Sequence, residues 1–227
     1  MKQNLRRAVN LTALVLATGL LIGLFTGCQQ NRPPAVGPHG SNESSQPNGP
    51  VQPTDPSIFR TDGNGVITGY TCYEEDLPKV LVIPAKIGEE VITGIGWSAF
   101  KDCTSLTELK LPASLTKIDN SAFRDCTGLT SIDLSGCTSL TEIVDGFSGC
   151  TGLTEVKLPA SLTYIGGYAF KGCIKLNSAV FANTTDWAVY DEFNNKYADI
   201  TSTGLDNAAI AAFYLCYTYV DNYWKKN

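Results

Sequence analysis

The sequence predicts a solenoid, in which short coils with parallel strands stack on one another. A motif in which a Phe lies three residues before a Cys, and the Cys three residues before a Leu, occurs four times. A segment with alternating apolar positions follows each copy, and this alternation is typical of a strand. The cysteines of the four copies step by 23, 24 and 23 residues: Cys103, Cys126, Cys150 and Cys173. This period predicts an α/β-type solenoid that is mostly β and irregular.

The strands are predicted from the segments that follow the cysteines. These segments are Leu106-x-x-Leu109-x-Leu111, Leu129-x-x-Ile132-x-Leu134, Leu153-x-x-Val156-x-Leu158 and Leu176-x-x-Ala179-x-Phe181. Their spacing is the leucine-rich-repeat pattern, whose period is roughly 20–29 residues. The second unit departs from it by two residues inserted within 135–139 and one residue lost before Phe147. We expect the insertion to form a loop on one edge and to leave the coil intact.

The repeated cysteines are predicted to be buried free thiols beside a ladder of Phe100, Phe123, Phe147 and Phe170. Equivalent positions of stacked coils lie about 4.8 Å apart with parallel side chains. A disulfide instead needs Cβ atoms about 3.8 Å apart that face each other. Without a C-x-x-C spacing, we expect no metal site. The pattern leaves the redox state of Cys72, Cys137 and Cys216 open.

Both ends of an open solenoid need a cover, since they expose core and sheet edges. At the N-terminal end, residues 59–68 read as a hairpin with a Gly/Asn turn. Asp62-x-Asn64 in this turn lacks the later ligands of a calcium loop. At the C-terminal end, Asp206 is expected to cap a helix with an apolar stripe of Ile210, Phe213, Tyr217, Val220 and Trp224. Packing and ligand binding are both open for the aromatic tail, and we take Trp187 and Tyr190 as an alternative binding site.

The first 27 residues are predicted to be an export signal. Three basic residues precede an apolar run from Leu11 to Phe25, which is shorter than the roughly 20 residues that span a bilayer. Phe25-Thr26-Gly27-Cys28 resembles the lipobox of bacterial lipoproteins, and the resemblance implies that Cys28 becomes the lipidated N-terminus. Cleavage by an ordinary signal peptidase is the alternative. Residues 28–57 carry seven prolines and are expected to be a disordered tether.

The repeat units closely resemble those of the BspA-like, or Treponema-type, leucine-rich-repeat surface lipoprotein family. Its units read L-x-x-L-x-L-P-x-x-L-x-x-I-x-x-x-A-F-x-x-C, and the match covers about Val80 to Ala182. Val80–Pro84 with Gly88–Gly96 looks like the first unit of that family, with a longer loop. The expected organisation is an N-terminal cap with a first repeat at 58–96, repeats at 97–182, and a C-terminal cap at 183–227. The resemblance implies adhesion to host extracellular matrix or to other bacteria.

Composition excludes several functions. Of 17 Lys and Arg, three lie before Cys28, so the remaining chain has 14 against 22 acidic residues, a net charge of −8, which argues against a nucleic-acid partner. The single histidine, His39, lies in the tether, which removes His-based catalysis. The hypothesis of a hydrolase that uses Asp186, Asp191 and Glu192 is supported only by the proximity of these residues in the sequence. We therefore expect a non-enzymatic protein without a cofactor.

The predicted binding face is formed by the residues between the core positions of each strand. These are Glu108, Lys110, Ser131, Asp133, Glu155, Lys157, Ser178 and Val180. A cross-strand charge ladder of Lys110, Asp133 and Lys157 that only keeps the sheet soluble is compatible with this reading. Five adjacent strands give about 400 Å², against about 800 Å² per partner in a standard interface. We therefore expect weak, multivalent binding of a protein by a lipid-anchored surface protein. The alternative is a structural or envelope-assembly lipoprotein that faces the periplasm.

Overall fold

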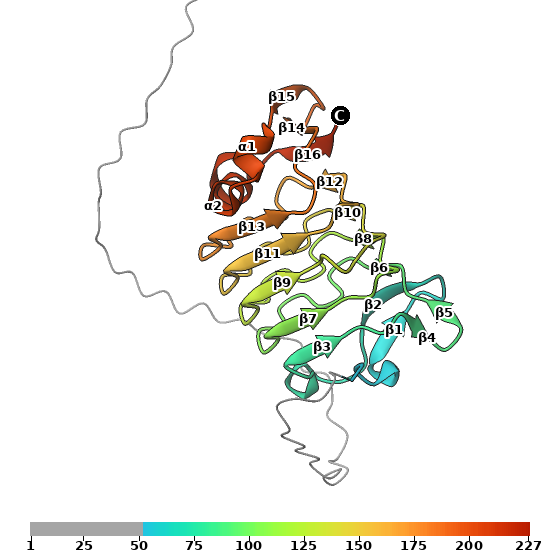
Figure 1. Ribbon diagram of the computed structural model, residues 1–227. Coiled ribbons are helices and arrows are strands. Elements are labelled where there is room, and N and C mark those ends of the chain that lie inside the picture. Colours follow the sequence, from blue (N-terminus) through green and yellow to red (C-terminus); the bar gives the residue numbers. More distant parts are fainter. Residues whose placement is uncertain (1–51) are drawn as a thin grey trace, which may run out of the picture. The chain divides into compact units, whose positions relative to one another are not determined.

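The computed structural model describes residues 52–227, which form a solenoid of stacked coils with a cap at each end (Figure 1). The predicted fold class is confirmed. The predicted signal segment, Cys28 and the tether up to residue 51 lie outside the described residues. Within 52–227, no helix is long and apolar enough to cross a membrane.

Two sets of parallel strands line the coils. The principal strands are β3 (Val80–Val82), β7 (Glu108–Lys110), β9 (Ser131–Asp133), β11 (Glu155–Leu158) and β13 (Ser178–Phe181). The strands on the opposite side are β6 (Gly94–Ile95), β8 (Lys117–Ile118), β10 (Glu142–Ile143) and β12 (Tyr164–Ile165), which pair in that order. The principal strands thus lie at the predicted positions. Their residues alternate, with one side chain in the core and the next outside, as the pleat of a strand requires.

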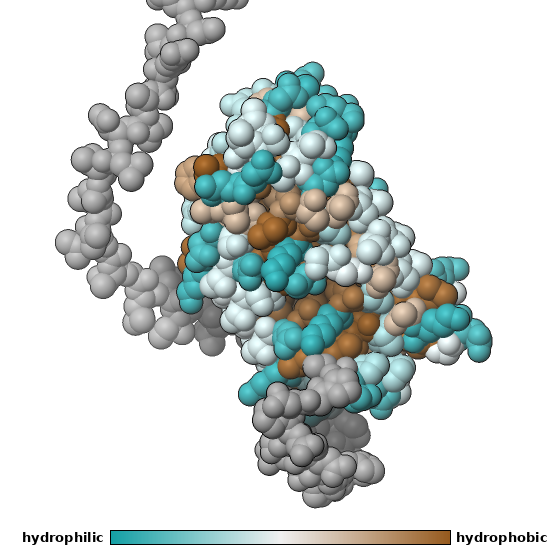
Figure 2. Space-filling model, viewed as in Figure 1, coloured by the Kyte–Doolittle hydropathy of each residue, from teal (hydrophilic) through white to brown (hydrophobic). Residues whose placement is uncertain are grey.

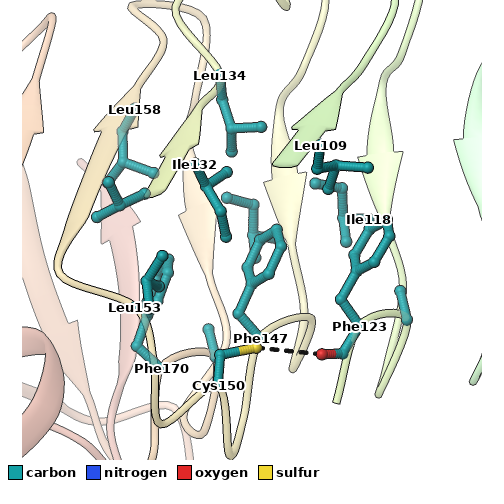
Figure 3. Close-up of a cluster of buried hydrophobic side chains, with 14 of the residues drawn as sticks. Leu109, Ile118, Phe123, Ile132, Leu134, Phe147, Cys150, Leu153, Leu158 and Phe170 are labelled. Atoms are coloured by element: carbon teal, nitrogen blue, oxygen red, sulfur yellow. Dashed lines mark hydrogen bonds between the residues drawn. The ribbon is translucent and has the colours of Figure 1, made fainter. Parts of the chain in front are cut away.

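The core between the two sets contains the predicted phenylalanine ladder (Figure 3). Phe123 stacks on Phe100 at 5.3 Å between ring centroids and on Phe147 at 5.5 Å. Phe147 in turn stacks on Phe170 at 5.7 Å. Tyr70 of the N-terminal cap extends the stack, since its ring lies 5.9 Å from that of Phe100. The ladder therefore has five rings and continues into the N-terminal cap.

The repeated cysteines are buried free thiols, as predicted, and each also makes a polar contact. Cys126 Sγ donates to the Phe100 carbonyl at 3.1 Å, and Cys150 Sγ donates to the Phe123 carbonyl at 3.2 Å (Figure 3). Cys173 repeats this contact with Phe147, also at 3.2 Å. Burial raises the pKa of the Cys150 thiol to about 12, so the thiol stays protonated and able to donate. The thiols thus join successive coils rather than filling space alone.

The residue before each repeated cysteine adopts a left-handed backbone. Its φ is 64° at Asp102, 59° at Asp125, 76° at Gly149 and 80° at Gly172. Asp and Gly are among the residues that tolerate this conformation. The turn lets the chain reverse from the phenylalanine edge into the next principal strand.

The N-terminal cap is the predicted hairpin of β1 (Phe59–Thr61) and β2 (Val66–Tyr70), and β2 pairs in parallel with β6. Asp62 stabilises the turn, since its Oδ1 accepts hydrogen bonds from the N–H groups of Asn64 and Val66. The longer loop of the first unit contains the hairpin of β4 (Lys86–Ile87) and β5 (Glu90–Val91). Short 3₁₀ turns lie at Pro56–Ile58 and Glu74–Asp76.

The predicted tether is ordered at its end. The Thr54 N–H donates to the Val82 carbonyl at 3.0 Å, and the Val82 N–H donates to Thr54 Oγ1 at 2.9 Å. These bonds cover the free edge of β3, which would otherwise expose unpaired backbone groups. The expected start of the folded part at residue 58 is therefore at least four residues too late.

The C-terminal cap contains more strand than predicted. Its strands are β14 (Trp187–Tyr190), β15 (Lys196–Asp199) and β16 (Tyr223–Lys226), and β16 joins the cap to β12. The predicted helix is replaced by α1 (Ser202–Leu205), α2 (Ala208–Phe213) and a π-helical turn at Tyr214–Thr218. Asn207, and not Asp206, caps α2, because its Oδ1 accepts the N–H groups of Ala209 and Ile210.

The prediction that the apolar stripe packs on the solenoid was also wrong. The C-terminal helical segment packs on the solenoid mainly with small residues. Ala211, Ala212, Leu215 and Cys216 are buried. Ile210, Phe213 and Tyr217 are instead exposed, and Trp224 is buried within β16. Figure 2 shows hydrophobic surface at the position of α2. The three stripe residues Ile210, Phe213 and Tyr217 therefore face solvent.

Candidate functional site: the outer face of the principal strands

The outer face of the principal strands carries two rows of side chains. Strand register places Glu155 beside Ser131 and Ser178, and Lys157 beside Asp133 and Val180. All eight residues predicted for this face are exposed or half-exposed. Val80 and Val82 extend the rows, since they pair with Glu108 and Lys110. Sequence reasoning missed these two valines, although their alternation around Leu81 was a usable signal.

The charges on this face form local pairs. Lys157 Nζ lies 3.2 Å from Asp133 Oδ2, whereas Lys110 Nζ lies 3.2 Å from Glu108 Oε1 of its own strand. The expected ladder from Lys110 through Asp133 to Lys157 is thus only half formed. Hydrogen bonds from Ser135, first from its hydroxyl, lower the pKa of Asp133, and Lys157 adds to this effect. Asp133 therefore stays ionised near neutral pH.

Successive coils are joined in a regular way at most principal strands. Before β11, the Thr154 N–H and Oγ1 both donate to the Thr130 carbonyl, at 2.8 and 2.9 Å. After β9, the Leu134 N–H donates to the Lys157 carbonyl at 2.9 Å. The same bonds join β7 to β3, through Thr107 to the Lys79 carbonyl and through Ile83 to the Lys110 carbonyl. Side-chain and backbone donors thus hold β7 on β3 and β11 on β9.

These hydrogen bonds between coils are missing between β7 and β9. Among the described residues, neither the N–H nor the hydroxyl of Thr130 bonds to the Thr107 carbonyl, and the Leu111 N–H does not reach the Asp133 carbonyl. The principal strands therefore form two sheets, β3–β7 and β9–β11–β13. The expected continuous face of five strands is wrong at this point. The opposite strands β8 and β10 of the same coils remain paired, so the irregular second unit separates one side of the coil only.

A hollow of about 320 Å³ lies at this break. Charged and hydroxyl side chains line it, with backbone of both strands between them. The lining residues are Thr107, Glu108, Leu109, Lys110, Thr130, Ser131 and Asp133. Four of the eight residues predicted for the binding face are thus brought together here. Thr107 and Thr130 were missed, because the sequence alone does not reveal a loss of register between coils.

The alternative aromatic site does not form as predicted. Trp187 is 1% exposed, and its indole N–H donates to the Asn183 carbonyl at 3.0 Å. Tyr190 is half-buried and donates its hydroxyl to Asn227 Oδ1 at 3.0 Å. The expectation of a ring open to a ligand is therefore wrong for Trp187, whereas the Tyr190 ring is half-exposed and stays a candidate. The exposed rings of the tail are elsewhere, at Phe193, Tyr197, Phe213 and Tyr217.

One of the carboxylates considered for hydrolysis, Asp191, serves the local fold. Asp191 Oδ1 accepts the N–H groups of Phe193 and Asn195, at 3.0 and 2.8 Å. Hydrogen bonds from Asn195, first from its side chain, lower the pKa of Asp191. An ionised turn acceptor of this kind lacks the raised pKa of a general acid.

The repeats decide the family of the chain. The sequence model of the BspA type leucine rich repeat region matches six copies over residues 68–218. The chain belongs to this family. Leucine-rich-repeat proteins are in general non-enzymatic scaffolds, and their folds commonly mediate protein interactions.

Solved structures of leucine-rich repeat proteins are similar to this BspA-type chain. One, from Bacteroides capillosus ATCC 29799, is 26% identical with a TM-score of 0.47, over 55% of this chain and 91% of that one. Another, from T. pallidum, is 26% identical with a TM-score of 0.35, over 56% of this chain and 71% of that one. No curated protein sequence matches this chain significantly.

Proposed function

We propose that the chain is a lipid-anchored bacterial surface protein that binds other proteins through the outer face of its principal strands. The observation that carries the proposal is the set of outward residues on β7, β9, β11 and β13, which are exposed or half-exposed and contribute little to the core. Solenoids of stacked repeats use such extended faces for binding. By its resemblance to the family, the partner is host extracellular matrix or a surface protein of other bacteria.

The size of the face favours weak contacts that add. The face is about half of a standard partner surface, and its break between β7 and β9 makes it less continuous than a single sheet. Many copies anchored in one membrane would raise the avidity without new contacts. A lipid on Cys28 and the proline-rich tether would supply that arrangement.

A charge exchange on β11 tests the binding face. The double variant Glu155→Lys with Lys157→Glu keeps the net charge and changes only the pattern on the face. We expect it to weaken binding of the protein to immobilised extracellular matrix, measured by surface plasmon resonance at high protein density. The matched control is Lys117→Glu with Glu142→Lys, which exchanges an ion pair of 3.8 Å on the opposite strands. Equal loss in both variants, or in neither, would place binding elsewhere.

Anchoring and topology have separate tests. Cys28→Ala should abolish fatty-acid labelling, because thiol acylation precedes cleavage at that residue; unchanged labelling would rule out the lipoprotein assignment. Protease treatment of intact cells distinguishes the two orientations, since a surface protein is digested and the alternative, a periplasm-facing assembly lipoprotein, is protected.

A further inference from the structure

We propose that the binding face continues from the principal strands onto the C-terminal cap, where exposed apolar side chains bind apolar anchor residues of the partner protein. These side chains, here called the C-terminal apolar patch, are Ile174, Ile210, Phe213 and Tyr217. The inference rests on the proposed function, because it names the partner chemistry at one end of the binding face. It is carried by the packing, the exposure and the charge surroundings of the patch.

The patch is contiguous and its rings are held in place. Phe213 and Tyr217 stack at 5.4 Å between ring centroids. The Tyr217 hydroxyl donates to the Ile174 carbonyl at 3.4 Å, which fixes this ring to the turn before β13. Ile210 lies three residues before Phe213 on α2, so the two side chains are neighbours on the helix surface. Rings that are fixed before binding lose little conformational entropy when a partner covers them.

The segment that carries most of the patch differs from a solvated surface helix. The solvent side of a helix usually carries charged residues, but no charged residue occurs between Asp206 and Asp221. Ala211 and Ala212 already pack this segment on the solenoid, so the exposed side chains contribute little to the core. Aromatic enrichment and a lack of charge are typical of the centre of a protein interface.

The patch supplies area that the strands lack. Phe213 is 55% exposed and Tyr217 is 53% exposed, and an aromatic side chain can bury roughly 150–250 Å², so these two rings offer about 200 Å². The segment packs beside β13, whose outward Val180 is also exposed. Figure 2 shows the hydrophobic surface at α2 in the same view as the principal strands of Figure 1. A partner that covers strands and patch together comes closer to the about 800 Å² of a standard interface.

The charges around the patch indicate a protein rather than an anionic membrane. Asp206 and Asp221 lie at the two ends of the uncharged segment, and Lys171 and Lys175 lie on either side of Ile174 in the sequence; all four are exposed. Asp221 Oδ1 lies 3.6 Å from Lys171 Nζ. Helices that enter an anionic membrane are rich in Lys and Arg, whereas a polar rim around an apolar centre is the anatomy of a protein interface.

The test uses a small probe and so does not need the natural partner. The full chain is titrated with N-acetyl-leucyl-phenylalanine amide while the backbone amides are followed by NMR. We expect saturable shifts of the Ile210, Phe213 and Tyr217 amides, with a dissociation constant on the order of 1 mM. The polar N-acetyl-seryl-glutamine amide should leave these amides unchanged.

Phe213→Ala should weaken the apolar probe about tenfold, as expected for an aromatic anchor. The variant keeps the fold, because the ring is exposed and Ala favours the helix. Phe193→Ala is the matched control and should not affect the probe, since this ring is also exposed but lies at the tip of the β14–β15 hairpin. The inference is overturned if the three amides do not shift, if both probes bind equally, or if both variants respond alike.

Two further measurements distinguish the other occupants. Sedimentation with phosphatidylcholine–phosphatidylglycerol vesicles should be equal for wild type and Phe213→Ala, which carry the same N-terminal segment. Analytical ultracentrifugation should likewise give the same mass for both. A loss of vesicle binding in the variant would assign the patch to a membrane, and a loss of dimer would assign it to a second copy; either result overturns the inference. The charge exchange on β11 lies outside the patch, so that experiment can succeed while this one fails.

Discussion

Truncating the central ring of the phenylalanine ladder is the sharpest test of the repeat architecture. Phe123 is 0% exposed and stacks on a ring at both faces. Phe→Ala in a packed core costs about 3–5 kcal/mol, and each ring pair adds about 0.5–1.5 kcal/mol beyond burial. Phe123→Ala should therefore fall near the upper end of the range, at about 4–5 kcal/mol. With a urea slope of about 2 kcal/mol/M, the unfolding midpoint should fall by about 2 M.

Two further positions calibrate this result. Phe170→Ala should cost less, about 3 kcal/mol, because Phe170 stacks on Phe147 alone. Phe193 is 77% exposed at the tip of the β14–β15 hairpin, so Phe193→Ala should leave the midpoint unchanged. The measurement is urea unfolding followed by circular dichroism. The ladder would be refuted if Phe123→Ala unfolded at the same midpoint as Phe193→Ala.

Three other predictions concern single positions. Gly128→Ala should destabilise by about 1–3 kcal/mol, because a Cβ there would lie 2.4 Å from the Thr104 carbonyl, whereas Gly136→Ala, in open space, should be neutral in thermal unfolding. Among the seven cysteines from 72 to 216, Cys72 should be alkylated first in the folded protein, since the other six are buried; peptide mass spectrometry that finds uniform labelling would contradict the burial. Burial raises the pKa of Asp145 in the folded protein, so ionisation of this carboxyl opposes folding. The wild type should therefore lose stability relative to Asp145→Asn as the pH rises from about 4, the ordinary pKa of Asp, through the raised pKa of the folded state. A stability difference that stays constant from pH 4 to 7 would show that Asp145 ionises freely.

Periodicity predicted the parts of the fold that repeat. The positions of Leu109, Cys126 and Phe123 follow from spacing alone, because equivalent residues of stacked coils share one environment. Spacing also marks Phe100 as the end of the ladder, whereas Tyr70 continues it from the N-terminal cap. A ring supplied by a non-repeating segment cannot be found by self-comparison.

The C-terminal cap shows where a pattern misleads. Ile210, Phe213 and Tyr217 have helical spacing, but the helix packs closely against β13 with Ala211 and Ala212. Small residues allow this close approach, and the large ones are left outside. The break between β7 and β9 escaped prediction for another reason. It depends on hydrogen bonds between coils, and the sequence of either coil does not determine them.

The thiol contacts of the core affect how such a chain can change length during evolution. The sulfurs of Cys126, Cys150 and Cys173 each bond to a carbonyl of the preceding coil and need no second sulfur. A duplicated or deleted coil therefore brings or removes one cysteine without leaving another unmatched, so odd and even numbers of coils are equally permitted. A scaffold held by disulfides would have to gain or lose cysteines in pairs. The core chemistry thus allows the array to grow by one unit at a time.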